Sequence, residues 1–324
     1  MKQPVCIKDP GEIEKFRASR FDIIKVPSHF KVESKLSRPG RFTVSEPVTI
    51  EGMATFENKP MKVVISSQKD NRPAFSTDGQ TILLNSKDLV HGTHNIQLGP
   101  VQIIEHPIAM MLALNLDLDF NISVPSFPTF DRCDATMIEA ILPYVTSSQQ
   151  LLKPFTVREP FALQFETGYC ILLPSWEGLT IDHQVEYPGF IGRQRVVEMI
   201  TSDFFQFLCA ARTPSVRSAT ETDQILAAIK TGQFPMPFTL DNVLVADENG
   251  YRNPRKEFEH EGHNFEFILH ELIDEMAWLK ILECDFGGKF HGHMITHRFG
   301  HAEQIMAASF CGSDQHRDYF RFKA

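Results

Sequence analysis

The chain has 324 residues, which is long enough for two domains of ordinary size or one large domain. Hydrophobic residues make up 42% of it and charged residues 23%, which is typical of a globular protein with a sizeable core. The formal net charge of −9 and the lack of a long basic run exclude nucleic acid and anionic membrane surfaces as expected partners.

Neither a membrane-spanning segment nor a secretory signal is expected. Residues 1–21 mix acidic and basic side chains, unlike a signal peptide, and the strongest apolar run covers only residues 107–114. A spanning helix needs about 20 apolar residues. The six cysteines stand far apart and form no CxxC pair, which predicts reduced thiols in a cytoplasmic protein and no disulfide framework.

In chain order, residues 1–40 show few periodic apolar positions, which predicts an extension on the surface. Alternating apolar residues then predict strands at 43–56, 61–66, 81–85 and 121–124. A helix is expected over 103–116, where Pro107 favours a start at Glu105 or His106, and another over 135–145, capped by Asp134. These elements predict a first α+β domain over residues 41–150.

The second half repeats this kind of organisation without repeating the sequence. Strands are expected at 161–173, 179–187, 195–200, 242–246 and 285–290. The expected helices are 202–211, behind a cap at Thr201 or Ser202, and 223–230, 265–282 and 293–310. The sequence therefore predicts an α+β protein with an N-terminal extension and two domains, residues 41–150 and 151–324.

Histidines are concentrated near one end, since seven of the thirteen lie between His260 and His301. In the predicted helix 265–282, His270 and Asp274 are four residues apart and therefore lie on one face. An imidazole and a carboxylate on one face can hold a divalent cation, and this combination suits catalytic zinc. Without further ligands, a surface hydrogen bond is the simpler interpretation of the same spacing.

Two other histidines follow residues that suggest a helix start. Glu105 precedes His106, so a carboxylate next to a ligand could activate a metal-bound water, although the dipeptide alone is more typical of a surface. Gly292 allows a sharp turn and leaves His293 at the start of the predicted helix 293–310.

His297 and His301 continue from His293 at four-residue steps. On a helix, this row would either form a second metal-binding face or lie as a polar stripe towards solvent. We favour the solvated stripe for His297 and His301.

A competing hypothesis places the base inside the long helix. The run from His270 through Glu271 to Asp274 is similar to a metalloprotease HExxH motif with Asp in the last place, and Glu271 would then be the base. This variant is less specific than HExxH. The sequence contains no GxSxG, Walker or GxGxxG motif, which excludes the usual serine-hydrolase, P-loop and dinucleotide-binding classes.

In order and approximate spacing, these elements resemble the zinc-dependent UDP-3-O-acyl-N-acetylglucosamine deacetylases of lipid A biosynthesis, over residues 42–308. The stretches that carry the resemblance are residues 101–106, 247–253 and 266–274, with weaker ones at Ala211-Arg212-Thr213, Gly192-Arg193 and Gly292-His293. The resemblance implies two α+β domains, each with a pair of helices packed on sheets, and a metal at their interface.

The resemblance also implies a role for individual residues. The zinc ligands would be His106, His270 and Asp274. Glu105 would be the general base, and Thr213 would help to hold the oxyanion. His293 would be the charged histidine that steadies the oxyanion and protonates the leaving amine. Zinc lowers the pKa of bound water to about 7, and a carboxylate can then take its proton. Two hydrogen-bond donors would stabilise the negative charge of the tetrahedral intermediate.

Several positions depart from the family pattern. Glu271 stands where a basic residue is usual, and Trp278 stands where an acidic residue would orient the catalytic histidine, a role left to Glu275 or Glu283. Phe56 replaces a histidine, and an Asp-Gly-Ser segment becomes residues 131–133. No cationic clamp for a diphosphate is evident. The metal and the hydrolytic step are therefore better supported than a lipid A precursor as substrate.

The leading hypothesis is a zinc hydrolase that removes an N-acyl (acetyl) group from an amino sugar, either free or linked to a nucleotide or lipid. Iron(II) would suit the same ligands. The alternatives are a catalytically inactive relative that binds a ligand or partner, and the metallopeptidase. Candidate substrate-binding residues are Gly192, Arg193, Phe204 and Phe205, although the two phenylalanines are more simply the core face of a helix.

Overall fold

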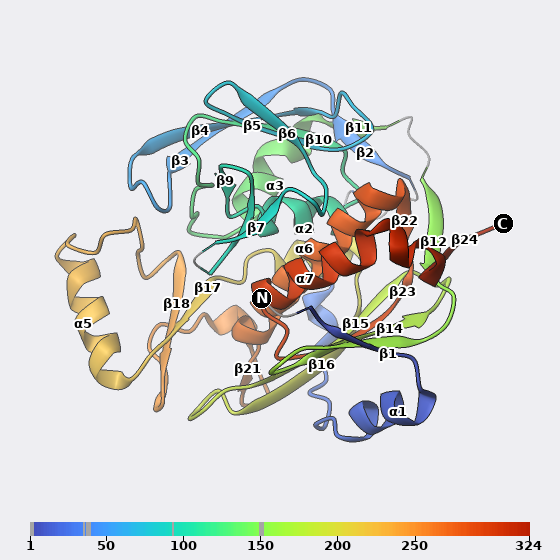
Figure 1. The fold of residues 1–324 in the computed structure, drawn as a ribbon. Helices are drawn as coiled ribbons and strands as arrows, with labels where there is room; N and C mark the ends of the chain where they lie inside the picture. Colours follow the sequence, from blue (N-terminus) through green and yellow to red (C-terminus); the bar gives the residue numbers. More distant parts are fainter. Residues whose placement is uncertain (1–2, 35, 37–39, 93, 149–151) are drawn as a thin grey trace.

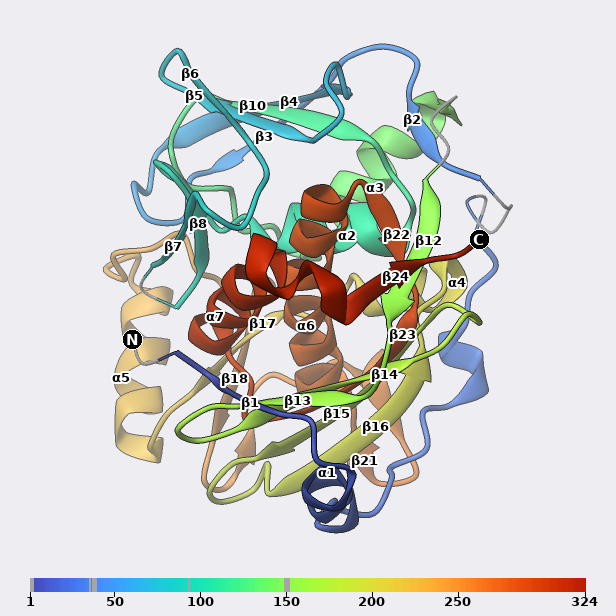
Figure 2. The same cartoon turned by 45° about the vertical axis from the view of Figure 1, so that its right-hand side comes forward.

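The computed structural model describes residues 3–34, 36, 40–92, 94–148 and 152–324. The described residues include a five-stranded and a six-stranded sheet, with helices α2 (Glu105–Ala113) and α6 (Glu266–Phe286) between them (Figure 1). The turned view in Figure 2 preserves this order of layers. The predicted α+β class is confirmed. The predicted boundary at residues 150 and 151 lies outside the described residues, and the domain limits remain a prediction.

The five-stranded sheet comes from the first half of the chain. Its strands are antiparallel except where β10 runs parallel to β5. Buried and exposed residues alternate along β4, so one face of this sheet covers the core. In sheet order, the strands are β3 (Val48–Met53), β4 (Pro60–Ser67), β10 (Leu118–Ile122), β5 (Ala74–Thr77) and β6 (Gln80–Leu83).

Smaller elements complete this half. Helix α3 (Ala135–Ile141) is followed by the 3₁₀ turn Leu142–Tyr144. The paired strands are β2 (Phe42–Val44) with β11 (Val145–Ser147), and β7 (Leu89–His91), β8 (Ile96–Leu98) and β9 (Val101–Gln102) in a separate small sheet.

The six-stranded sheet draws on both ends of the chain. All neighbouring strands are antiparallel except the parallel pair β15 and β23. In sheet order, the strands are β1 (Val5–Ile7), β13 (Phe161–Gln164), β14 (Tyr169–Pro174), β23 (Gly292–His297), β15 (Leu179–Glu186) and β16 (Arg193–Met199).

The two faces of this sheet meet different neighbours. Helices α6 and α7 (His301–Gly312) lie on one side and α1 (Pro10–Ala18) on the other (Figure 1). Side chains alternate along a strand. Met294 accordingly joins the large core, whereas Ile295 packs in a separate cluster with Ile13 of α1.

The remaining elements of the second half surround α6. They are α4 (Ser202–Leu208), α5 (Ala219–Lys230), the sheet of β17 (Thr213–Val216), β18 (Val243–Asp247) and β19 (Gly250–Tyr251), the hairpin of β20 (Glu259–His260) and β21 (His263–Asn264), the sheet of β22 (Gly288–Phe290), β12 (Lys153–Val157) and β24 (Phe320–Phe322), and the 3₁₀ turns Lys256–Phe258 and Asp314–Tyr319.

Within the predicted N-terminal extension, the described residues pack against the six-stranded sheet and the core. β1 adds an edge strand to the six-stranded sheet, and α1 covers one face of it. Phe30, in the 3₁₀ turn Ser28–Phe30, is fully buried and stacks on Phe207 with ring centres 4.1 Å apart. Local periodicity does not report these contacts, because they join residues far apart in sequence.

The C-terminal quarter contains a correction. The predicted helix 293–310 is strand β23 followed by α7, which starts only at His301. The predicted strand 285–290 is shorter, because α6 continues to Phe286 and ends at Gly287 in the left-handed region, with φ 63°. No helix in the described part of the chain has the length and apolar character needed to cross a membrane.

Candidate active site

A cavity of about 640 Å³ lies beside α2 and α6 and is lined by residues of both halves of the chain. His106, His270 and Asp274 all face it, and one potential ligand atom from each lies within 4.8 Å of the other two. α2 supplies His106 from its second residue, and α6 supplies the other two from successive turns. The helix pair therefore brings together the three residues that the sequence predicts as ligands.

The orientation of His270 suits metal binding. Its side chain is almost fully buried, and Nδ1 lies 3.0 Å from the carbonyl oxygen of Ala211. A carbonyl oxygen only accepts hydrogen bonds, so Nδ1 carries the proton and Nε2 keeps its lone pair. Nε2 lies 3.8 Å from Oδ2 of Asp274. Two imidazoles and a carboxylate with this tautomer are a donor set that fits zinc or iron(II).

Glu105 is the first residue of α2 and also lines the cavity. Its Oε2 accepts a hydrogen bond of 3.0 Å from the backbone N–H of Ile96, which fixes the orientation of the carboxylate. Burial raises the pKa of Glu105, and the nearby His301 and His106 oppose this rise only in part. A carboxylate with a raised pKa is a stronger base than one in water.

His301 lies in the cavity, at the first position of α7. Its Nε2 is 3.8 Å from Oδ2 of Asp274, and its Nδ1 is 3.2 Å from Oε1 of Gln304. Burial lowers the pKa of His301, but Asp274 and Glu105 raise it more, so that the net shift is upward. A histidine whose pKa is raised beside the predicted ligands is suited to give a proton to a leaving group.

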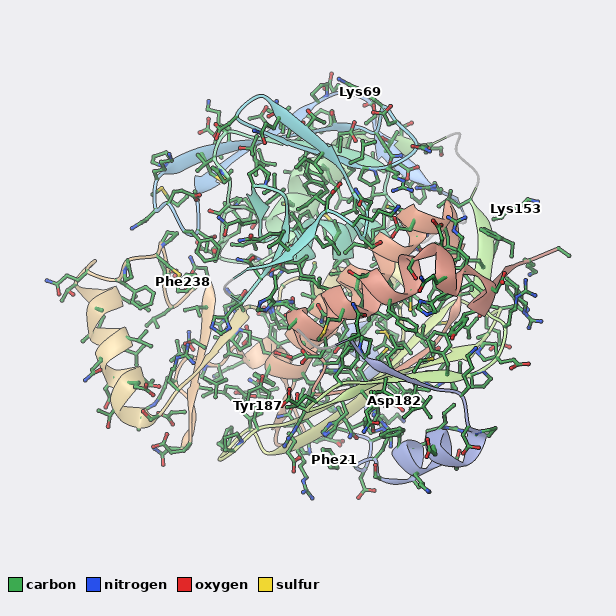
Figure 3. The ribbon with its side chains drawn as sticks, viewed as in Figure 1. Phe21, Lys69, Lys153, Asp182, Tyr187 and Phe238 are labelled. Carbon is green, nitrogen blue, oxygen red and sulfur yellow. The ribbon has the colours of Figure 1, made fainter. Side chains whose placement is uncertain are left out.

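The structure does not bring His293 to this cavity. His293 lies on β23, with Asp182, Arg17, Arg20 and Arg195 as its charged neighbours. These groups gather on the side of the sheet that faces the N-terminal segment, and Figure 3 labels Asp182 there. The cavity is instead lined by His301, which the sequence interpretation assigned to a solvated stripe.

A local signal for His301 does exist in the sequence. Gly300 stands in extended backbone before the helix, and its N–H bonds to the carboxylate of Glu303 at 3.2 Å. Glycine followed three residues later by glutamate is a typical helix start. The signal was masked because histidines at four-residue spacing favoured one continuous helix.

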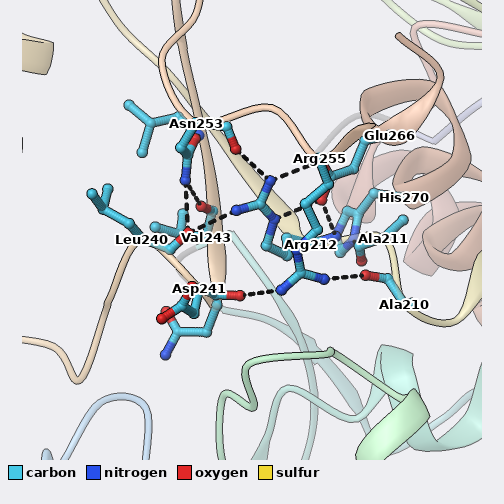
Figure 4. A network of polar contacts seen from close by, with 12 residues as sticks. Ala210, Ala211, Arg212, Leu240, Asp241, Val243, Asn253, Arg255, Glu266 and His270 are labelled. Carbon is cyan, nitrogen blue, oxygen red and sulfur yellow. Dashed lines mark hydrogen bonds and ion pairs between the residues drawn. The ribbon is translucent and has the colours of Figure 1, made fainter. Parts of the chain in front are cut away.

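Thr213 also lines the cavity, as the first residue of β17. The residue before it, Arg212, is buried and donates two hydrogen bonds of 2.6 and 2.8 Å to the carboxylate of Glu266 on α6. Arg212 also donates to the carbonyl oxygens of Leu240 and Asn253 (Figure 4). This ion pair fixes the segment that carries both Thr213 and the carbonyl oxygen which orients His270.

Glu271 adds another carboxylate to the cavity lining, near the side chain of Tyr187. Burial, followed by the negative charge of Asp274, raises the pKa of Glu271 to about 7. Its raised pKa and its position in the cavity both suit the role of base that the HExxD hypothesis gives to Glu271.

The other sequence candidates occupy different places. Phe204 and Phe205 are fully buried core residues of α4, as the simpler interpretation expects. Gly192 lies in the turn between β15 and β16, with φ 59°. Arg193 is exposed and bonds to Glu186 at 2.8 Å. None of these four lines the cavity formed by the described residues.

The acidic residues offered as partners of the catalytic histidine are also engaged elsewhere. Glu275 lies 3.0 Å from Nδ1 of the buried His183, and Glu283 lies 3.3 Å from the ammonium of Lys289. Trp278 is fully buried, whereas Phe56 lines the cavity. The carboxylate that forms an ion pair with His301 is that of Asp274, at 3.8 Å.

Comparison with known proteins gives a consistent result. The sequence profile of the family described as UDP-3-O-acyl N-acetylglycosamine deacetylase matches residues 41–309. The chain is 23% identical over 286 residues to the UDP-3-O-acyl-N-acetylglucosamine deacetylase of Leptospira biflexa serovar Patoc, covering 83% of this chain and 88% of that protein. The protein of the same name from Legionella pneumophila (strain Corby) is 25% identical over 207 residues, covering 61% of this chain and 64% of that protein.

Proposed function

This chain belongs to the UDP-3-O-acyl N-acetylglycosamine deacetylase family, and on that premise we propose that it is a metal-dependent hydrolase that removes the acyl group from the nitrogen of an amino sugar. The observation that carries the proposal is the approach of His106, His270 and Asp274 within 4.8 Å, in a cavity that Glu105 also lines. A relative that only binds a ligand would not need a general base such as Glu105 beside three metal ligands.

We assign His106, His270 and Asp274 as the residues that hold the metal, zinc by preference and iron(II) as the alternative. When bound, the ion would supply Lewis acidity to the amide carbonyl and to the attacking water. The orientation of His270 is set beforehand by the carbonyl oxygen of Ala211.

The remaining roles follow from position and charge. Glu105 takes a proton from the attacking water while the oxygen of that water forms a bond to the acyl carbon. The Thr213 hydroxyl donates a hydrogen bond to the oxygen on which negative charge develops. When the carbon–nitrogen bond breaks, His301 gives its proton to the departing nitrogen, so that the products are a carboxylate and an amine.

The substrate class follows from the family and from the size of the cavity. The relatives from Leptospira and Legionella are named for a UDP-linked acylated amino sugar. A cavity of about 640 Å³ can enclose a sugar with its acyl group. We propose an N-acyl amino sugar as substrate, with a nucleotide-linked form as the first to test.

The decisive experiment measures metal content by mass spectrometry in wild type and in His270→Ala, with His263→Ala as the control. His263 lies in the exposed hairpin and does not line the cavity. We expect about one zinc or iron per chain in wild type and control, and loss of it in His270→Ala. Metal-free wild-type protein after zinc addition would overturn the proposal and leave a ligand-binding relative.

The loaded enzyme is then assayed for amine release from N-acetylglucosamine and from its UDP-linked form. We expect release that depends on His270. A metal-loaded wild type that releases amine from neither compound would contradict the amino-sugar assignment while leaving the metal site standing.

The metallopeptidase remains a second candidate because Glu271 also lines the cavity and has a pKa of about 7. The deacetylase proposal expects Glu105→Gln to lower kcat on the order of 10³-fold, and Glu271→Gln to lower it less than about 10-fold. Peptide hydrolysis that is lost with Glu271→Gln and kept with Glu105→Gln would reverse the assignment.

A further inference from the structure

A second set of potential ligands lies around Nδ1 of His106, in the lining of the same cavity. Cys133 Sγ and Asp134 Oδ2 each lie 3.4 Å from Nδ1 of His106, and the three groups are mutually within 4.8 Å. We propose that Cys133, Asp134 and Nδ1 of His106 form a second site for a thiophilic divalent cation, and that its occupation competes with the catalytic site for His106.

The separations match those of a tetrahedral site. With metal–sulfur and metal–nitrogen bonds of about 2.3 and 2.0 Å, tetrahedral geometry separates the two ligand atoms by about 3.5 Å. A nitrogen and an oxygen ligand are separated by about 3.4 Å in the same geometry. The two observed distances of 3.4 Å therefore need no large movement of these side chains.

Asp134 gives independent support for a ligand at this place. It is buried, with 1% of its surface exposed, and Oδ2 lies 3.4 Å from Nδ1 of His106 without meeting hydrogen-bond geometry. It stands at the N-cap position of α3, yet its side chain does not cap that helix. A buried carboxylate that does not cap its helix and whose contact with the His106 ring is as long as 3.4 Å is only partly compensated, and a cation would satisfy it.

The chemistry of the three groups selects the kind of cation. Thiolate, imidazole and carboxylate together favour zinc, cobalt(II) and cadmium over magnesium or calcium. On binding, the Cys133 thiol and Nδ1–H of His106 release their protons to solvent, and the metal takes their place. Without a second cation, the neighbouring Asp134 carboxylate favours a proton on Nδ1, which leaves the lone pair of Nε2 for the catalytic metal.

Competition follows because both sites use one imidazole. A ring that binds a second cation through Nδ1 is a changed ligand at Nε2, and Asp134 is no longer available to orient it. Only this consequence for activity rests on the proposed function. The second site itself requires no deacetylase activity.

The test is a cobalt(II) titration of the whole chain, followed by absorption in the near ultraviolet. A thiolate bound to cobalt gives a charge-transfer band there, and the catalytic set contains no sulfur. We expect the band in wild type and in Cys6→Ser, which changes a partly exposed thiol outside the cavity, and its loss in Cys133→Ser. Asp134→Asn should weaken cobalt binding at least about 10-fold.

His270→Ala separates this proposal from the proposed function. That variant loses one ligand of the catalytic set and keeps all three of the second set, so the band should persist. Cadmium in excess should inhibit wild type about 10-fold more than Cys133→Ser, each measured against its own uninhibited rate.

No band in wild type, or an equal band in Cys133→Ser with an unchanged melting temperature, would overturn the second site. If wild-type protein shows the band but binds no metal at His106, His270 and Asp274, the proposed function would be contradicted and the second site would stand.

Discussion

His293 and His301 lie eight residues apart and meet different surroundings. His301 begins α7 and faces the cavity beside Asp274, where neighbouring carboxylates raise its pKa. His293 lies on β23, where burial and then three arginines lower its pKa, although Asp182 opposes them. The same side chain is therefore favoured as a charged acid in one place and as a neutral group in the other.

The cause of the difference is the sheet. β23 pairs with β14 on one side and β15 on the other, so its residues alternate between two faces. Thr296 faces α6 and lies 2.8 Å from His183, whereas His293 faces the N-terminal segment. The strand ends at His297 and serves as a scaffold, whereas the candidate catalytic histidine lies beyond it, at the start of α7.

The largest expected effect separates these two histidines. His301→Ala should lower kcat by about 10²- to 10⁴-fold, because the leaving nitrogen loses its proton donor. His293→Ala should change kcat less than about 3-fold. Steady-state kinetics on metal-loaded proteins makes the comparison, and a greater loss of kcat in His293→Ala would restore the role predicted from the sequence.

Two threonines, one in the cavity and one in the sheet, allow the same comparison with a smaller expected loss of kcat. Thr213→Val should lower kcat about 10²-fold, because a donor to the oxyanion is lost, and Thr213→Ser should recover most of the loss. Thr296→Val, in the sheet, should mainly lower the free energy of unfolding, by about 1–3 kcal/mol, because His183 loses a buried partner. Equal kinetic losses in the two valine variants would contradict the assignment of Thr213.

The face of the six-stranded sheet that meets the N-terminal segment should make the free energy of unfolding depend on pH. Arg20 and Asp182 form a buried pair at 2.6 Å. Burial acts to raise the pKa of Asp182, but Arg195 and Arg20 outweigh it and lower the pKa overall. The carboxylate thus stabilises the fold fully above its unfolded pKa of about 3.9, and this contribution is lost as pH falls through the lower folded pKa.

Urea unfolding at neutral and acidic pH tests this linkage. Arg20→Met should cost about 1–3 kcal/mol at pH 7, because Arg195 still pairs with Asp182 at 2.7 Å, and less as Asp182 becomes protonated in acid. The control is Arg193→Met, which removes an exposed pair with Glu186 and should cost less than about 1 kcal/mol. A penalty for Arg20→Met that does not shrink in acid would show that packing, and not the charge pair, explains the loss.

Local sequence patterns were sufficient for several parts of the protein. Helix α2 begins at Glu105 because Pro107 fits only the first turn, and α6 carries His270 and Asp274 at helical spacing. The α+β class and the family are both confirmed. These features depend on periodicity, caps and short motifs, which neighbouring residues determine.

Other parts depended on contacts between distant residues. Residues 294–296 have strand-forming side chains, but the histidine spacing around them favoured a helix, and only pairing with β14 and β15 decides the matter. Phe30 packs in the core against Phe207, and β1 pairs with β13. In both cases the partner lies more than a hundred residues away in the sequence.

The sequence by itself determined the types of group available for the chemistry, together with the helices that carry His106, His270 and Asp274. The tertiary structure alone decided which further histidine joins them, and it placed Cys133 and Asp134 beside His106. The physical reason is that a ligand set is defined by distances of a few ångströms between side chains. Such distances are fixed by how helices and sheets pack, and residue spacing along the chain reports them only within one regular element.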